Sequence, residues 1–265
     1  MGYPLRWPNF SASDSVNKPL QHAKALVKDT MRLLGHEYVP YSLNEAVNFD
    51  KQTIFIAVPK TGTTSVRVQI CPKGKPLIPN PHLNILQIRD SLYTYVLRAS
   101  LAQNTRFPSE GVPTDAEVRE RTKEVFDTFF KFSAARNPWA RAVSLYYRRE
   151  GVQVAEEMSF EEFCEQHRYA NDTCRHPTLH QNQLDWMVDE NGALALDYVY
   201  KVENYGDAIK EIADLTDGRL QLEYKEANTN PKSKSRNYQD LYTDKTRKLI
   251  AKHFEKDIDF FKYTF

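Results

Sequence analysis

The chain has 265 residues, a length that favours one large α/β domain over two small ones. Apolar residues make up 41% of it and charged residues 27%, a composition that excludes wholesale disorder. Its 36 Lys and Arg nearly balance 35 Asp and Glu, which leaves a formal net charge of +1. Proteins that bind long polyanions usually carry a basic surplus. This balance argues against nucleic-acid binding but leaves room for a local basic pocket.

Apolar strand patterns and amphipathic helix patterns alternate along the chain. The expected strands cover residues 53–58, 132–135 and 198–202. The expected helices cover residues 18–34, 65–70, 82–97, 114–130, 138–149, 206–215 and 244–254. Thr114 and Ser159 each open a capping box with a Glu three residues later. This order predicts an α/β fold with a central parallel sheet flanked by helices. We expect a single domain over residues 51–265, with residues 1–50 as an extension packed on it.

Cysteine usage and hydropathy indicate in which cellular compartment the protein is expected. Cys71, Cys164 and Cys174 are a sparse, odd set, unlike the dense framework of a small secreted scaffold, and Cys71 is expected to be an inert buried thiol. A zinc site built from Cys164, Cys174, His176 and His180 would lack the usual C-x₂₋₄-C pair, so no metal is expected. No apolar leader opens the sequence and no window approaches ~18 consecutive apolar residues. We therefore expect a cytoplasmic protein with no membrane partner, and its oligomeric state stays open.

The first candidate site is the segment PKTGTTS at residues 59–65, between the first expected strand and the helix after it. At such a place backbone N–H groups and the positive end of a helix converge on an anion. Lys60 adds a full charge, and Gly62 permits close backbone approach. Further donors are the hydroxyls of Thr63, Thr64 and Ser65. The segment departs from the G-x-x-x-x-G-K-[ST] loop of nucleotide triphosphatases, because its Lys precedes the Gly.

This turn resembles the 5′-phosphosulfate loop of sulfotransferases that use PAPS (3′-phosphoadenosine 5′-phosphosulfate), PK-[TAS]-G-[TG]-[TS]-[SW]. Residues 136–147 are similar to the family's 3′-phosphate motif, R-N-P-x-x-R-x-x-S-x-Y. The resemblance implies a P-loop-like sulfotransferase fold and a set of PAPS-binding residues. That set is Arg136 and Ser144 for the 3′-phosphate, with Lys60, Thr61, Gly62, Thr63, Thr64 and Ser65 for the 5′ end. Arg141 and Tyr147 are assigned to packing and salt bridges.

Three weaker matches favour the carbohydrate-type branch, sulfotransferase family 2. Residues 183–192 resemble a Q-x-D-[YW]-[LM] segment that leads into a turn. Residues 197–204 resemble a strand that ends in a characteristic Glu, here Glu203, and residues 238–265 resemble the closing helix. The resemblance covers residues 53–265 and leaves the N-terminal extension outside it.

Transfer of a sulfuryl group to a hydroxyl should proceed in line, with positioning and charge stabilisation supplying most of the catalysis. Lys60 would neutralise charge on the bridging oxygen as adenosine 3′,5′-bisphosphate leaves. A His is the natural base near neutral pH. His82 is favoured, because several related chains use a His at a similar place between loop and helix. A helix-capping role for His82 stays open, as do His176, His180 and Glu203 as alternative bases.

The sequence supports a PAPS-dependent sulfotransferase that acts on a hydroxyl, or an amine, of a small metabolite or saccharide. Lys234 and Arg236 lie in a basic segment where the family often closes over the nucleotide, so they are candidate PAPS contacts; a solvated loop is an equal alternative. The near-zero charge disfavours a polysaccharide acceptor. A nucleotide-binding protein without turnover and a Mg²⁺-dependent P-loop kinase stay open. The acceptor depends on loops that periodicity does not define.

Overall fold

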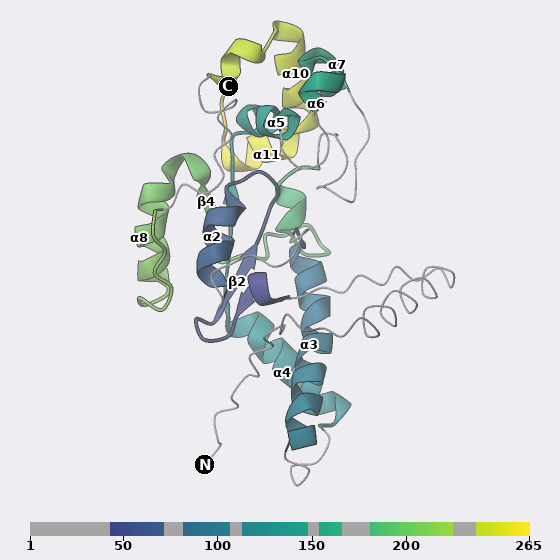
Figure 1. Cartoon of the computed structure of the whole chain (residues 1–265), viewed down its shortest axis with the longest axis vertical. Helices are drawn as coiled ribbons and strands as arrows, with labels where there is room; N and C mark the ends of the chain where they lie inside the picture. Colours follow the sequence, from purple (N-terminus) through teal and green to yellow (C-terminus); the bar gives the residue numbers. More distant parts are fainter. Residues whose placement is uncertain (1–42, 72–81, 107–112, 148–153, 166–180, 225–236) are drawn as a thin grey trace, which may run out of the picture.

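The computed structural model describes residues 43–71, 82–106, 113–147, 154–165, 181–224 and 237–265 (Figure 1). The helix expected over residues 18–34 lies outside the described residues, as do His176, His180, Lys234 and Arg236. The described parts form a four-stranded sheet flanked by helices, which confirms the predicted α/β fold class.

The sheet has the strand order β1-β2-β3-β4. Its strands are β1 (Val47–Asn48), β2 (Thr53–Ile56), β3 (Phe130–Ala135) and β4 (Tyr198–Lys201). β2, β3 and β4 run parallel, with Thr53 paired to Phe130 and Phe132 paired to Tyr198. These are the three predicted strands. β2 is buried at every position and is the most conspicuous of them, because a parallel strand buried on both faces is mostly apolar, whereas β3 and β4 include Lys131 and Lys201.

β1 is an antiparallel edge strand that the sequence did not predict. It pairs with β2 through Val47 and Asn48, so the sheet is not purely parallel. Two residues are too few to show a period of two, which is why the strand was missed. β1 lies in the expected N-terminal extension, and this part of the extension packs on the core. The limits 1–50 and 51–265 as domain boundaries stay a prediction.

Helices connect and follow the strands. The α-helices are α2 (Thr63–Ile70), α3 (Ile85–Arg106), α4 (Asp115–Thr128), α5 (Pro138–Tyr146), α6 (Val154–Glu157), α7 (Phe160–Glu165), α8 (Tyr205–Leu215), α10 (Asp244–His253) and α11 (Glu255–Phe261). Short 3-10 helices are η1 (Leu43–Glu45), η3 (Leu184–Trp186), η4 (Val202–Asn204) and η5 (Tyr238–Leu241). The expected helices that fall in the described parts are confirmed, with differences at their ends. α3 continues past residue 97, and the closing helix is followed by α11 after a break at Phe254, where φ is −107°.

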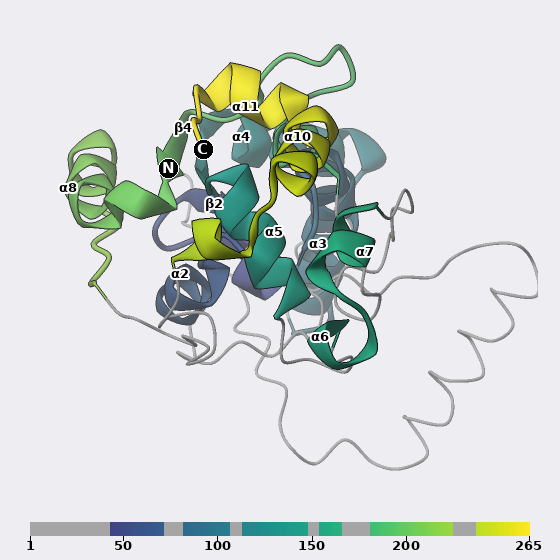
Figure 2. The same ribbon diagram turned by 90° about the horizontal axis from the view of Figure 1, so that it is seen from above.

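Helices cover both faces of the sheet. Ile54 and Ile56 of β2 pack on one face and Phe55 on the other, and all three are fully buried. The first face packs against α3, α5, α10 and α11, and the second against α2 and α8. Figures 1 and 2 show α2 and α8 on one side of β2 and α3 on the other. The sheet is therefore a rigid central layer that positions the loops at its ends.

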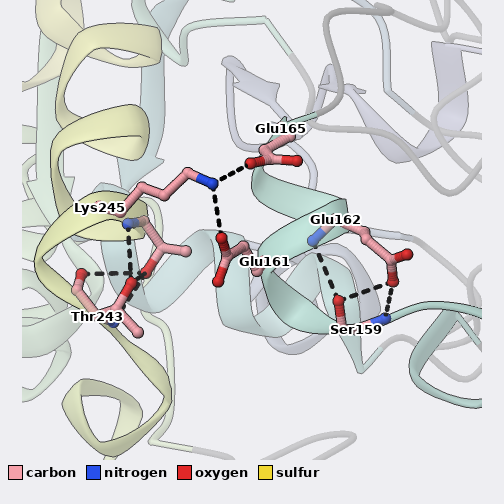
Figure 3. Close-up of polar contacts among 7 residues, drawn as sticks. Ser159, Glu161, Glu162, Glu165, Thr243 and Lys245 are labelled. Carbon is pink, nitrogen blue, oxygen red and sulfur yellow. Dashed lines mark hydrogen bonds and ion pairs between the residues drawn. The ribbon is translucent and has the colours of Figure 1, made fainter.

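Ion pairs join α7 to α10 on the surface (Figure 3). Lys245 of α10 lies 2.7 Å from the Glu161 carboxylate and 2.6 Å from that of Glu165, both on α7. α7 begins with the predicted capping box, in which Ser159 Oγ accepts from the Glu162 N–H at 3.2 Å. The Glu162 carboxylate in turn accepts from the Ser159 N–H at 2.7 Å. The cap and the ion pairs support α7 in different ways and can be separated by mutation.

Ser159→Ala should lower the free energy of unfolding by about 1 kcal/mol, because α7 loses the side chain that satisfies its first turn. Lys245→Ala is the matched control on the same helix pair. Exposed ion pairs contribute little, so its effect should stay within about 0.5 kcal/mol. Urea denaturation measures both values. A larger loss for Lys245→Ala than for Ser159→Ala would contradict this ranking.

Candidate active site

The loops that follow β2, β3 and β4 lie at one edge of the sheet. Carboxyl ends of parallel strands share an edge, and ligands of open α/β sheets bind there. Residues 59–62 follow β2, Arg136 and Asn137 follow β3, and Glu203 follows β4. The structure brings the two predicted motifs into contact, because Arg136 Nη1 donates to the Lys60 carbonyl oxygen at 3.2 Å.

The loop between β2 and α2 contains two residues in the left-handed conformation. The φ angle is +66° at Lys60 and +71° at Gly62. A Cβ added at Gly62 would meet Val202 Cγ1 at an ordinary 3.8 Å, so the φ angle, and not a lack of space, requires glycine here. The same conformation costs a lysine about 1–2 kcal/mol. Contacts around Lys60 must offset that cost.

α2 begins at Thr63, earlier than the expected start at Ser65. Its N-cap residue is Gly62, which supplies no side-chain cap, so the first turn keeps the positive end that favours an anion. The Thr61 hydroxyl is buried and donates to the Val58 carbonyl oxygen at 3.0 Å. Thr61 is therefore suited to bind an anion through its backbone N–H and not through its side chain.

Two arginines bind carbonyl groups of this loop. Arg141 in α5 donates from Nε to the Pro59 carbonyl oxygen at 3.0 Å, and Arg136 binds the next carbonyl along the chain. Arg141 is fully buried and lies over the ring of Phe254, 5.4 Å from its centroid. Burial lowers its pKa to about 10, so the guanidinium stays charged at neutral pH. Arg141 packs in the interior, as expected, and its described contacts are with carbonyl oxygens and a ring and include no salt bridge.

The backbone of Arg136 is held by a pair of side chains, which we call the Gln183–Asp257 clamp. The Gln183 side chain accepts from the Arg136 N–H at 2.8 Å and donates to the Arg136 carbonyl oxygen at 2.9 Å. Asp257 of α11 accepts from the Gln183 N–H at 2.8 Å and from the Leu184 N–H at 2.9 Å. Gln183 and Asp257 are both fully buried. Gln183 and Asp257 lie in the two segments, residues 183–192 and 238–265, that resemble the family. The resemblance pointed to these segments but did not show that the two side chains hold Arg136.

Glu203 is bound by the turn that follows β3. Its carboxylate accepts from the Asn137 N–H at 2.7 Å and from the Tyr263 hydroxyl at 3.3 Å. Asn137 in turn caps α5, because its side-chain oxygen accepts from the Trp139 N–H at 3.1 Å. Glu203 thus stabilises the turn next to Arg136. These two hydrogen bonds weigh against its use as a base.

His82 lies before α3 and hydrogen-bonds to Ala57, the residue that follows β2. Its Nδ1 is 2.6 Å from the Ala57 carbonyl oxygen. A carbonyl oxygen can only accept, so Nδ1 carries the proton and Nε2 keeps its lone pair. Trp186 packs edge to face against the imidazole, with the ring centroids 6.3 Å apart. Asn84 and Gln87 exchange hydrogen bonds of 2.8 and 2.9 Å at the start of α3, so the helix is capped without His82.

The surroundings of His82 keep its ring neutral. Burial lowers the pKa of His82 to about 4, and the positive charges of Arg67, Lys60 and Arg141 act in the same direction. The hydrogen bond to the Ala57 carbonyl acts in the opposite direction and is outweighed. At neutral pH the imidazole is therefore uncharged, and Nε2 can accept a proton.

The remaining predicted residues and features are placed as follows. Ser144 lies half-buried in α5, and its role toward a phosphate stays a prediction. Cys71 is buried, as expected, and so is Cys164, whose pKa burial raises to about 12. Within the described residues, no group of His, Cys, Asp and Glu side chains is arranged to hold a metal ion. In the same parts of the chain, no helix has the length and apolar character needed to cross a bilayer.

The low pKa of His82 should make the fold sensitive to acid. Between pH 6.5 and about 4 the unfolded chain binds a proton at this residue while the folded protein does not, so acid in this window favours unfolding. The residue's share of the slope is at most about 1.4 kcal/mol per pH unit. His82→Asn keeps a donor for the Ala57 carbonyl but cannot titrate, so its free energy of unfolding should fall less steeply with acid. Urea denaturation between pH 4 and 7.5 measures this, and parallel pH profiles for the two proteins would refute the assignment.

Comparison with known proteins agrees with this geometry. The family model described as "Sulfotransferase family" matches residues 46–264, which is most of the chain and includes both motifs predicted to bind an anion. No curated protein and no solved structure matches the chain. The match begins at the residue before β1 and ends next to the last residue, so it takes in the whole described sheet. The chain belongs to the sulfotransferase family, in its family 2 branch.

Proposed function

We propose that this sulfotransferase moves the sulfuryl group of PAPS to a hydroxyl, or an amine, of a small metabolite or saccharide. The observation that carries the proposal is the loop after β2, where the left-handed Lys60 and Gly62 and the start of α2 meet Arg136. Ammonium, guanidinium and backbone N–H groups are the donors that bind phosphate and sulfate groups in proteins. This donor set fits the two anionic groups of PAPS.

The residues that would hold PAPS fall into two groups. The 5′-phosphosulfate would bind Lys60, Thr61, Gly62, Thr63, Thr64 and Ser65. The 3′-phosphate would bind Arg136 and Ser144. Lys234 and Arg236, which lie outside the described residues, are further candidate contacts of PAPS. Bound PAPS would supply the sulfuryl group and a leaving adenosine 3′,5′-bisphosphate. The proposal includes no metal ion, because Lys60 and the N–H groups of α2 supply positive charge at the place where charge would develop.

In the proposed reaction His82 is the base, and Lys60 stabilises the leaving group. His82 Nε2 takes the proton of the acceptor hydroxyl, and Lys60 stabilises negative charge on the oxygen that leaves. A base with a pKa near 4 is weak in the free protein; burial is the main cause of this low pKa, and the negative charge of a bound nucleotide would counter the smaller effect of the nearby cations. The lone pair on His82 Nε2 and the engaged carboxylate of Glu203 both support His82 as the base.

The distribution of charge supports a small acceptor. The chain as a whole carries a formal charge of +1, so the cations around the loop are balanced elsewhere. Such a local concentration of charge suits one nucleotide better than a long sulfated glycan, which needs an extended basic surface.

The alternative to an enzyme is a protein that binds the nucleotide without turnover. The buried cysteines support the proposed reducing, cytoplasmic location.

Isothermal titration with adenosine 3′,5′-bisphosphate in EDTA tests the cofactor. The protein should bind the nucleotide without a divalent metal. Lys60→Ala should weaken binding about tenfold to a hundredfold, because a charge-assisted hydrogen bond is lost, while thermal unfolding shows the variant to be folded. No binding by the unaltered protein would overturn the PAPS assignment. Binding only of ATP with Mg²⁺ would favour a kinase.

A mass-spectrometric screen for the gain of one sulfuryl group tests turnover, with PAPS supplied to a panel of small hydroxyl and amine compounds. For an acceptor found in this way, His82→Asn should lower kcat about 10²-fold to 10⁴-fold, because the base is removed. Its affinity for adenosine 3′,5′-bisphosphate should stay within about twofold. Undiminished turnover in His82→Asn would exclude the histidine base while leaving the enzyme assignment intact.

A further inference from the structure

Arg141 is a fully buried cation whose described contacts do not neutralise it. Its Nε donates to the Pro59 carbonyl oxygen at 3.0 Å and its Nη1 to the Gln181 carbonyl oxygen at 3.1 Å. Nη2 has no hydrogen-bond partner among the described residues. Asp257 is the carboxylate whose charge acts on it. A buried charge of this kind loses its hydration at a cost, and a protein with an apolar residue of similar volume in its place is often no less stable. Stability alone therefore does not account for an arginine here.

The contacts of Arg141 and Arg136 point to a shared effect on the phosphate loop. The two guanidinium groups bind the consecutive carbonyl oxygens of Pro59 and Lys60. In a planar trans peptide the C=O of one residue and the N–H of the next point in opposite directions. The N–H groups of Lys60 and Thr61 therefore point away from the two arginines. Anion-binding concavities of proteins are built from successive N–H groups of this kind.

The same contacts explain how Lys60 stays in the left-handed conformation. The peptide before Lys60 is held through the Pro59 carbonyl and the peptide after it through the Lys60 carbonyl. When both flanking peptide planes are held, the φ and ψ angles of the residue between them are held as well. The positive φ of Lys60 would otherwise be disfavoured for a residue with a Cβ.

We propose that Arg141 is a positioning residue of the phosphate loop, residues 59–62. With Arg136, it binds carbonyl groups on the side of the loop opposite to the 5′-phosphate and so orients the N–H groups of Lys60 and Thr61 toward that phosphate. This inference rests on the proposed function. Arginine suits the task because its planar fork spans two carbonyl groups, those of Pro59 and Gln181, whereas lysine offers one compact charge. Gln181 also lies two residues before Gln183, so Arg141 connects the loop to the segment that holds Arg136.

Nucleotide affinities separate this role from a general effect on stability. Adenosine 3′,5′-bisphosphate carries the phosphate that the loop would bind, and adenosine 3′-monophosphate lacks it. Arg141→Met and Arg141→Lys should each weaken binding of the bisphosphate about tenfold, since misdirected N–H groups lose part of a charge-assisted contact. Binding of the monophosphate should change by no more than about twofold. Titration calorimetry measures the dissociation constants of both nucleotides for each of the two variants and for the unaltered protein.

Tyr242→Phe is the matched control. It removes one hydrogen bond to α5, from the Tyr242 hydroxyl to the Trp139 carbonyl oxygen at 2.8 Å, without touching the loop. The ratio of the two affinities should be unchanged in this variant, even if its melting temperature falls as much as in the Arg141 variants. Should Arg141→Met fail to fold, Arg141→Lys decides the question alone.

Three outcomes would overturn the positioning role. They are an equal weakening of both nucleotides, no change for the bisphosphate, and full retention of its affinity in Arg141→Lys, which would assign the effect to charge alone. Each presupposes that the unaltered protein binds the bisphosphate. If it does not, the proposed function fails first, so the two failures are distinguishable.

Discussion

The parallel pairing of β2 with β3 is the constraint on which the candidate site depends. Ile56 lies beside Ser133 in this register, so the two strands end at the same edge. The Ser133 hydroxyl reinforces the pairing by donating to the Ile56 carbonyl oxygen at 2.7 Å. Lys60 and Arg136 meet at that edge although 76 positions separate them in the chain. A slip of one residue would turn every side chain of a strand to the other face and separate the two motifs.

Features that depend on neighbouring residues could be predicted from the sequence. The three parallel strands are short, mostly apolar or aromatic runs, and the capping boxes at Thr114 and Ser159 require only a Glu three residues later; all of them are confirmed. Where the local signal is weak, the prediction was incomplete. β1 has two residues, too few for a pattern, and α11, which follows the predicted closing helix, has seven, fewer than the window over which a helical period is recognised.

Contacts between distant segments could not be predicted in the same way. The bond between Arg141 and the Pro59 carbonyl joins positions 82 residues apart, and the bond between Gln183 and Asp257 joins positions 74 apart. Periodicity and propensity describe single elements and carry no information on such pairs. The proposed anion-binding residues could be named from the sequence because their motifs are local. The residues that position them, and the tautomer of His82, required the three-dimensional structure.

A crystal structure of the complex with adenosine 3′,5′-bisphosphate is the most direct test of the central claim, that the loop after β2 binds the 5′ end of the nucleotide. We predict the 5′-phosphate within about 3 Å of Lys60 Nζ and of backbone N–H groups at residues 60–65. The 3′-phosphate should lie against Arg136 and Ser144. A nucleotide with its two phosphates exchanged, or one bound away from this edge of the sheet, would contradict the account.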